Sequence, residues 1–262
     1  MNSIDAKYIS DNIETVKDFV TAEMTESQFL SSIEKDMTSL QQFFMYYKCA
    51  IMEVETKFKV LNEQFSLHGE SNPIEFIESR IKSYGSLYKK MESKSIPKNL
   101  DAIESSIHDI AGVRVVCSFI QDIYHLADCF LAQDDIRLIE KKDYIRDPKP
   151  NGYRSLHLIV EVPIFLEHEK RPIKVEVQLR TIAMDFWASL EHKIYYKFEG
   201  NAPDYISRDL RECSGIVSML DAKMLSLNNA IMDAKKEQIE AKAHEKLEQR
   251  MAERGETYNP NI

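Results

Sequence analysis

Lysine and arginine side chains gather in two short stretches of the sequence, residues 80–94 and residues 141–154. Each stretch contains only one or two acids. The bases are Arg80, Lys82, Lys89, Lys90 and Lys94 in the first stretch and Lys141, Lys142, Arg146, Lys149 and Arg154 in the second. Phosphate groups attract cations, whereas a divalent metal prefers oxygen anions. Two basic clusters close to a few carboxylates therefore predict a site for a metal-bound polyphosphate.

The carboxylate of Glu176 lies in a segment, residues 174–180, in which polar and apolar residues alternate. In a β-strand this alternation places Glu176, Gln178 and Arg180 on one face and the apolar side chains on the other. Taken alone, the pattern is typical of a strand with one face in water. The segment runs straight into an apolar helix, however, where a charged face needs another reason. This favours the polar face as part of a site.

A second alternating segment, residues 155–162, carries His157 opposite its apolar side chains, and a turn with Pro and Gly precedes it. The turn projects Lys149, Tyr153 and Arg154 together. An aromatic ring beside cations suits stacking on a nucleotide base next to its phosphates. A histidine at a strand edge and an ordinary surface loop would give the same pattern, so both interpretations stay open.

Two weaker patterns lie upstream. Lys82, Ser86 and Lys90 recur at intervals of four and would line one face of a helix, which is also typical of a solvated basic face. Asp109 precedes a β-rich segment in which Arg114 comes early. An acid at that position is often only a cap or turn residue.

The elements that must position these residues begin with a long helix. Apolar residues recur three or four apart over residues 25–66, which predicts one long amphipathic helix, or two in line, packing on a core or on another subunit. A new helix is expected from Pro73 to about Ser93, because proline suits the first helical turn.

An α/β core is expected next, followed by helices. The predicted strands are residues 113–119, 136–140, 155–162 and 173–180, with a helix near residues 121–133. A helix around Trp187 and a helical arm from Pro203 complete the chain. Beyond Ala234 the arm is predicted to be a solvated helix or a frayed tail, because charged residues dominate there.

Composition excludes several classes of protein. The 262 residues are 44% apolar, and no stretch approaches the ~18 apolar residues that span a membrane. The N-terminus has no apolar core of a secretion signal, and the four cysteines show neither a CxxC pair nor zinc spacing, so a reducing cytoplasm is expected. The formal charge is −9, with 6 bases and 12 acids in residues 1–72. This balance disfavours a broad nucleic-acid surface and leaves room for nucleotides in the local basic clusters.

Together these segments resemble the synthetase domain of the RelA/SpoT family in order and spacing. The blocks read R-x-K-x-x-x-S-x-x-x-K-M, then D-I-A-G-x-R, then K-D-Y-I-x-x-P-K-x-N-G-Y-R-S-L-H, then V-E-V-Q-L-R-T-x-A-M-D-F-W-A-x-x-E-H. The resemblance covers about residues 73–200 and is to the small alarmone synthetases. It implies an α/β (α+β) fold: a nucleotidyltransferase-like mixed β-sheet flanked by helices, with long N- and C-terminal helices. Residues 1–72 would be a helical extension for packing or oligomer contacts, 73–200 the catalytic domain, and 201–262 a helical arm with a charged tail.

The resemblance also implies a reaction and a donor site. The family transfers the β,γ-pyrophosphate of ATP to the 3′-hydroxyl of GDP or GTP, giving ppGpp or pppGpp and AMP in the stringent response. Asp109 and Glu176 are the implied catalytic residues and Mg²⁺ ligands, and Glu176 is also the implied base. The implied ATP-binding residues are Arg80 and Arg114, which would clamp adenine, and Lys82, Ser86 and Lys90, which would hold the phosphates.

The implied acceptor site centres on Tyr153, which matches the guanine-stacking tyrosine of the family. The implied GDP- or GTP-binding residues are Lys149, Tyr153, Arg154, His157, Gln178 and Asp185. The loop before the tyrosine reads R-x-K-D in bifunctional relatives and E-x-D-D in synthesis-only ones. Here it reads E-K-K-D from Glu140 to Asp143, a mixture that leaves the choice between GDP and GTP open.

The resemblance finally implies a homotetramer, built through the flanking helices. No alarmone hydrolase is expected, because residues 1–72 are too short for that domain and contain one histidine, His68. Two alternatives stay open. One is a toxin-type pyrophosphokinase acting on tRNA or adenine nucleotides, and the other is an inactive nucleotide-sensing oligomeric module.

Overall fold

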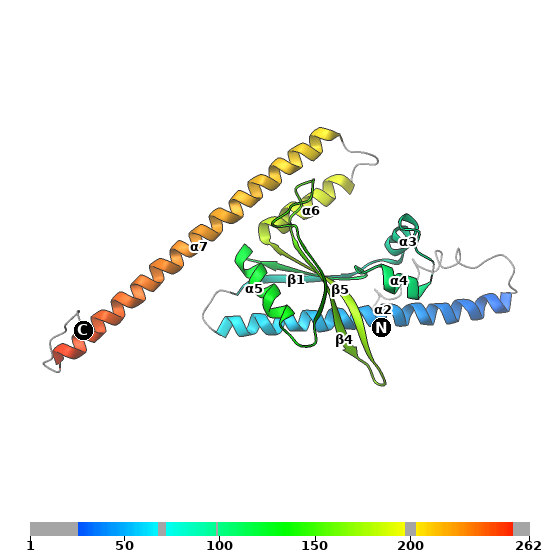
Figure 1. Cartoon of the computed structure of the whole chain (residues 1–262), viewed down its shortest axis with the longest axis horizontal. Helices are drawn as coiled ribbons and strands as arrows, with labels where there is room; N and C mark the ends of the chain where they lie inside the picture. Colours follow the sequence, from blue (N-terminus) through cyan, green and yellow to red (C-terminus); the bar gives the residue numbers. More distant parts are fainter. Residues whose placement is uncertain (1–25, 68–71, 98, 197–202, 254–262) are drawn as a thin grey trace.

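The computed structural model describes residues 26–67, 72–97, 99–196 and 203–253, and it consists of a mixed β-sheet flanked by helices (Figure 1). The strands are β1 (Ile74–Ile81), β2 (Ala111–Cys117), β3 (Arg137–Asp143), β4 (Leu156–Phe165) and β5 (Lys170–Thr181). The helices are α2 (Glu26–Leu67), α3 (Tyr84–Ser93), α4 (Leu100–Ser106), α5 (Ile120–Leu131), α6 (Ile182–Tyr196) and α7 (Asp204–Glu253). The predicted fold class, including the long helices near each end, is confirmed. Residues 1–25, His68 and residues 254–262 lie outside the described residues, so the predictions for those parts remain untested.

The five strands are ordered β1-β2-β5-β4-β3, with β5 in the middle. β2 and β5 run parallel, and the other neighbouring pairs are antiparallel. The helix α5 lies between β2 and β3 in the sequence and packs against the sheet beside α2. The central position of β5 gives its alternate side chains neighbours on both sides.

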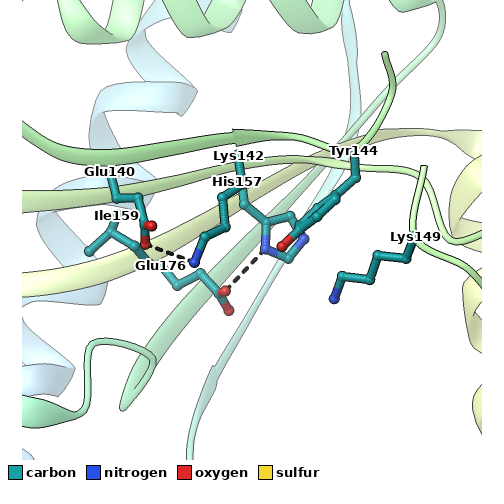
Figure 2. A pocket seen from close by; sticks show the side chains of 7 residues that line it. All are labelled: Glu140, Lys142, Tyr144, Lys149, His157, Ile159 and Glu176. Atoms are coloured by element: carbon teal, nitrogen blue, oxygen red, sulfur yellow. Dashed lines mark hydrogen bonds and ion pairs between the residues drawn. The ribbon is translucent and has the colours of Figure 1, made fainter. Parts of the chain in front are cut away.

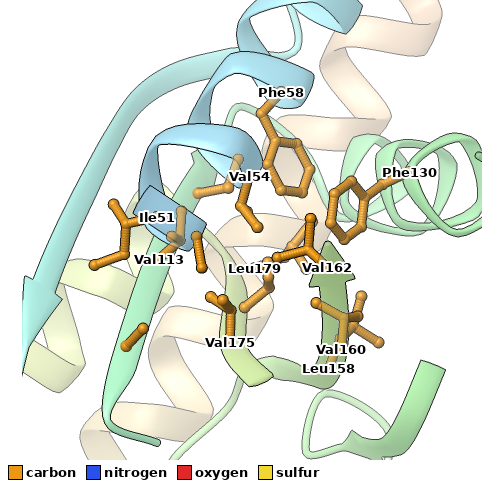
Figure 3. Packing of buried hydrophobic residues seen from close by; sticks show 14 of the residues in the cluster. Ile51, Val54, Phe58, Val113, Phe130, Leu158, Val160, Val162, Val175 and Leu179 are labelled. Carbon is orange, nitrogen blue, oxygen red and sulfur yellow. The ribbon is translucent and has the colours of Figure 1, made fainter. Parts of the chain in front are cut away.

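One face of the sheet forms the core under α2 and α5 (Figure 3). Val113, Val175 and Val177 are at most 1% exposed on this face. Above them the rings of Phe58 on α2 and Phe130 on α5 stack with their centroids 4.5 Å apart. The predicted long amphipathic helix is therefore confirmed as a core-packing helix, because its apolar stripe covers the sheet.

The predicted helix from Pro73 to Ser93 is wrong in its first half. Residues 74–81 form β1, which pairs antiparallel with β2, and α3 begins only after its cap residue Ser83. Isoleucines spaced three and four apart imitate a helical face in this segment. The edge of β2 offers unpaired backbone groups, however, and β-branched residues suit the pairing that satisfies them. Lys82 thus lies in the turn before α3 and does not share its helical face.

The helix α7 is attached to the sheet through α6 and the turn before β4. Trp187 on α6 donates its Nε1–H to the Leu210 carbonyl at 2.9 Å, and Ser214 Oγ donates to the Gly152 carbonyl. Thr181 at the end of β5 donates its hydroxyl to Asp221 Oδ2 at 2.7 Å. The predicted helix of the C-terminal arm is confirmed and continues to Glu253, and its side chains from Lys235 to Lys246 are exposed (Figure 1). None of the described helices combines the length and apolar character needed to cross a membrane.

Asp221 provides a test of how α7 is held. Burial raises the pKa of this carboxyl above its ordinary value, although the Thr181 hydroxyl and the charge of Arg154 act in the opposite direction. The folded state therefore binds the proton more tightly than the unfolded state, and stability is lost as pH rises from the ordinary aspartate value through the raised pKa of the folded state. We expect Asp221→Asn to unfold at higher denaturant concentration than the wild type at pH 7, and we expect this gain to shrink toward pH 4.

The matched control is Asp233→Asn, at an exposed position of the same helix. Its stability should stay within about 0.5 kcal/mol of the wild type, as is usual for surface substitutions. A loss of stability in Asp221→Asn at pH 7 would show that the ionised carboxylate is required there.

Candidate active site

Side chains from all five strands share the face of the sheet opposite α2. Strand pairing places Arg80, Gly112, Glu176, Ile159 and Glu140 in one row across the sheet. The next row contains Glu78, Arg114, Gln178, His157 and Lys142. Glu176 and Gln178 therefore lie at the centre of a polar surface, and the alternation seen in the sequence of β5 is not that of a merely solvated strand.

Asp109 receives two lysine ammonium groups at the end of the loop before β2. Lys82 Nζ lies 2.6 Å from Oδ2 and Lys90 Nζ lies 2.7 Å from Oδ1. Burial raises the pKa of Asp109, but the hydrogen bonds and charges of the two lysines outweigh it and leave the pKa below its ordinary value. The carboxylate is thus ionised at neutral pH, and two cations stand beside it where phosphate groups could bind.

A shallow hollow beside this cluster is lined by Arg80, Gly112, Arg114 and Gln178, among others. The two arginines come from neighbouring strands and are diagonal to one another on the same face. Arg114 Nη1 forms ion pairs with Glu78 Oε2 at 3.4 Å and with Asp185 Oδ1 at 3.2 Å. Two guanidinium groups around a hollow can stack on the faces of a flat base.

A directed chain of hydrogen bonds leads to Glu176 from the other side. Arg180 Nη2 donates to the Tyr153 hydroxyl, and this hydroxyl lies 2.7 Å from His157 Nε2. His157 Nδ1 lies 3.2 Å from Glu176 Oε1, and Gln178 Nε2 donates to Glu176 Oε2 at 2.7 Å. With its proton on Nδ1, His157 can donate to Glu176 and accept the proton of the Tyr153 hydroxyl at Nε2. Both oxygens of Glu176 are therefore held in place.

Glu176 opens into a cavity of about 180 Å³ that β3, β4, β5 and the loop after β3 enclose (Figure 2). Its lining consists of Glu140, Lys142, Tyr144, Lys149, His157, Ile159 and Glu176. Burial raises the pKa of Glu176, whereas the contacts with His157 and Gln178 lower it more, so that the net shift is downward. The nearby charge of Asp109 acts on the same group and raises its pKa. Glu176 is thus an ionised carboxylate between the lysine cluster and this cavity.

The loop before β4 places an aromatic ring at the edge of the cavity. Lys149 Nζ lies 4.7 Å from the centroid of the Tyr153 ring and 4.6 Å from that of Tyr144. Gly152 adopts a φ of +94° in this loop, which directs Tyr153 toward His157. A ring with a cation above it matches the expected surface for a base next to phosphates.

The structure brings together most, but not all, of the predicted site residues. Arg154 donates to the Ile145 carbonyl at 2.9 Å and is not among the cavity-lining residues, so its contact here supports the loop. Ser86 lies at the start of α3 beside the cap residue Ser83. Asp185 lies between two arginines, away from the cavity lining. The roles implied for these residues remain predictions.

The sequence places Arg180 on the polar face of β5 but gives it no role in the site; in the structure it is 4% exposed and joins three polar side chains of the site. The alternation of Glu176, Gln178 and Arg180 along the strand is the pattern that indicates its place in the site. Tyr144 and Lys142 were also missed as cavity residues. They follow a register shift between Leu138 and Glu140 that no sequence pattern reveals.

The donor set fits a small hard cation. Mg²⁺ is commonly bound by one or two carboxylates together with substrate phosphates, so a cage of protein ligands is not needed. Asp109 and Glu176 offer two ionised carboxylates whose charges interact. No cluster of three or more potential metal ligands occurs in the described part of the chain. The two carboxylates could hold such an ion only together with phosphate oxygens.

A family model described as "Region found in RelA / SpoT proteins" matches residues 79–201. The chain is 42% identical over 202 residues to the GTP pyrophosphokinase YwaC of Bacillus subtilis. The aligned region covers 77% of this chain and 96% of that protein. The chain belongs to the RelA/SpoT family. This confirms the resemblance that the four sequence blocks suggested.

Solved structures of RelA/SpoT family members share the fold. The crystal structure of small alarmone synthetase 2 from Bacillus subtilis has a TM-score of 0.67 and 44% identity over 73% of this chain and 98% of that chain. Small alarmone synthetase 1 from the same organism, bound to its product pppGpp, has a TM-score of 0.68 and 35% identity over 74% and 98% of the chains. Both likenesses extend over nearly the whole length of these family members.

Proposed function

We propose that this protein synthesises ppGpp and pppGpp by transferring the β,γ-pyrophosphate of ATP to the 3′-hydroxyl of GDP or GTP, with release of AMP. The observation that carries the proposal is the position of Glu176 between the Asp109–Lys82–Lys90 cluster and the cavity beside Tyr153. A reaction between two nucleotides needs such a junction. The similarity to GTP pyrophosphokinases and to a structure holding pppGpp supports it.

On the donor side, adenine would lie between Arg80 and Arg114 in the hollow on β1 and β2. The ATP phosphates would then reach Lys82, Lys90 and the start of α3 with Ser86. Backbone N–H groups at a helix N-terminus favour phosphate, and lysine charges neutralise it. Mg²⁺ held by Asp109 and Glu176, when bound, would withdraw charge from the phosphate oxygens. The lysines would exchange the Asp109 carboxylate for phosphate contacts as the nucleotide enters.

On the acceptor side, guanine would stack on the ring of Tyr153, and Lys149 would move from that ring to the acceptor phosphates. The 3′-oxygen then attacks the β-phosphorus of ATP while the bond from that phosphorus to the bridging oxygen of AMP breaks. Glu176 Oε1 or Oε2 accepts the hydroxyl proton. His157 and Gln178 keep the carboxylate pointed at that proton, which is the positioning that general base catalysis requires.

The assembly proposed is a homotetramer acting in the cytoplasm in the stringent response, with Mg²⁺ as cofactor and without alarmone hydrolysis. An exposed apolar stripe on α7 supports the oligomer, since Leu220, Met224, Leu227 and Ile231 are each at least half exposed. Large apolar patches on one helix face are typical of subunit contacts. Light scattering should give the mass of four chains, and the mass of one chain would contradict the tetramer.

The test of the function is a transfer assay with ATP labelled in its γ-phosphate and GDP, GTP, AMP or tRNA as the offered acceptor. The proposal predicts label in a guanosine product with GDP or GTP. Label on tRNA or AMP alone would instead establish the toxin-type alternative. No labelled product with any acceptor, although nucleotides bind, would establish the inactive sensing module.

A further inference from the structure

Arg180 is a nearly buried guanidinium at the end of β5, with 5% of its side chain exposed. Nη2 donates to the Tyr153 hydroxyl and to Gln178 Oε1, the latter at 3.0 Å, and Nη1 donates to Asp185 Oδ1 at 3.1 Å. Its planar group also lies 5.0 Å from the centroid of the Tyr153 ring. One rigid fork therefore fixes three side chains at once, and two of them reach Glu176 directly or through His157.

Asp185 connects this fork to the donor side. The same Oδ1 atom that accepts from Arg180 lies 3.2 Å from Arg114 Nη1, and the Asp185 side chain is 13% exposed. Arg114 borders the hollow on β1 and β2, whereas Arg180 holds Tyr153 at the cavity. A single carboxylate oxygen thus joins one guanidinium from each side of the site.

We propose that Asp185 and Arg180 couple the binding of the donor nucleotide to that of the acceptor nucleotide. The proposal rests on the proposed function. A base that stacks on Arg114 fixes the orientation of its guanidinium group, and Asp185 passes this constraint to Arg180, Tyr153 and Gln178. The second nucleotide then binds to side chains that are already ordered, so its binding costs less conformational entropy. Linkage requires that each nucleotide tighten the other by the same factor.

This role differs from the one that the resemblance implies for Asp185, direct contact with guanine. A residue that only reads guanine contributes equally to acceptor affinity with and without a donor. A residue that links the two sites contributes mainly when both are occupied. The ratio of the two acceptor affinities therefore separates the two roles.

The experiment is calorimetric titration of the full chain with GDP in the presence of Mg²⁺, with and without an ATP analogue whose α- and β-phosphates are joined by a methylene group. This analogue cannot transfer pyrophosphate. We expect the analogue to tighten GDP binding by about fivefold or more in the wild type, the usual lower range of coupling between sites. In Asp185→Asn the factor should fall toward one, because the amide can no longer hold both guanidinium groups.

Glu78→Gln is the matched control, because Glu78 is the other carboxylate paired with Arg114 but has no contact with Arg180 among those described. The coupling factor should survive in this variant. If Asp185→Asn proves unstable, Arg180→Lys serves instead, since lysine keeps the charge without the fork and should lose the coupling as well.

Three results would overturn the inference. GDP affinity that falls equally with and without the analogue in Asp185→Asn would make Asp185 a reader of guanine. A wild-type factor of one, with both nucleotides bound, would remove the coupling and leave the proposed function standing. Failure of the wild type to bind either nucleotide would remove the proposed function itself.

Discussion

Glu176→Gln is expected to lower turnover by about 10²- to 10⁴-fold, the usual contribution of a positioned general base. The amide keeps the shape of the side chain but can neither take the proton of the 3′-hydroxyl nor bind a cation with full charge. Initial rates of AMP formation with ATP and GDP would measure the loss. The pKa of Glu176 lies below its ordinary value, so the wild type should lose this base only below the ordinary glutamate range.

The control for Glu176→Gln is a test that the variant remains folded. Glu176 lies on the polar face of β5, and its neighbours Val175 and Val177 carry the core contacts. Thermal unfolding of Glu176→Gln should therefore stay close to that of the wild type. Undiminished turnover in a folded variant would remove Glu176 from the mechanism.

Gly152→Ala is expected to damage both stability and acceptor binding. Residue 152 has a φ of +94°, and an added Cβ would lie 2.7 Å from Ser214 Cβ and 3.3 Å from the backbone Cα of Arg211. A strained backbone of this kind costs about 1–3 kcal/mol, and forced overpacking against α7 adds a similar amount. Because Tyr153 follows directly, the KM for GDP should rise by about tenfold for each 1.4 kcal/mol that the loop loses.

The matched control is Gly215→Ala, because Gly215 lies on α7 next to Ser214. An added Cβ at Gly215 meets nothing within 4 Å, and alanine is the better helix former by roughly 0.5–1 kcal/mol. This variant should gain stability and keep its KM. Equal stability of the two variants in chemical denaturation would show that the packing of α7 against the loop around Gly152 is not tight enough to exclude a Cβ.

The sequence was sufficient to predict the sheet and its reactive face where side chains alternate. In β5 the alternation separated Val175 and Val177 from Glu176, because a buried central strand tolerates no exception on its core face. The segment of β1 was assigned to a helix, since most of its side chains are exposed at an edge and only its pairing with β2 defines it. Local patterns contain no information about such pairing.

In the site, too, the sequence predicts which residues take part but not which of them are in contact. Asp109 and Lys90 are far apart in sequence, and only the folding of α3 beside the β2 loop brings them within 2.7 Å. Lys82 reaches Asp109 although it is not on the helical face predicted for it. The position of Arg180 follows from the alternation, but its links to Tyr153 and Asp185 depend on how the loop before β4 and α6 dock on the strand. Contacts of this kind arise from tertiary packing.

Phosphorus NMR of the products formed from ATP, GDP and Mg²⁺ tests the central claim most directly, because it identifies which bond of ATP breaks. Transfer of pyrophosphate predicts AMP and a guanosine carrying diphosphates on its 5′- and 3′-oxygens, in equal amounts. Formation of ADP would instead indicate transfer of a single phosphoryl group. AMP with free pyrophosphate and unchanged GDP would indicate hydrolysis. The first result would contradict the transfer of pyrophosphate, and the second would contradict the activation of the 3′-hydroxyl by Glu176.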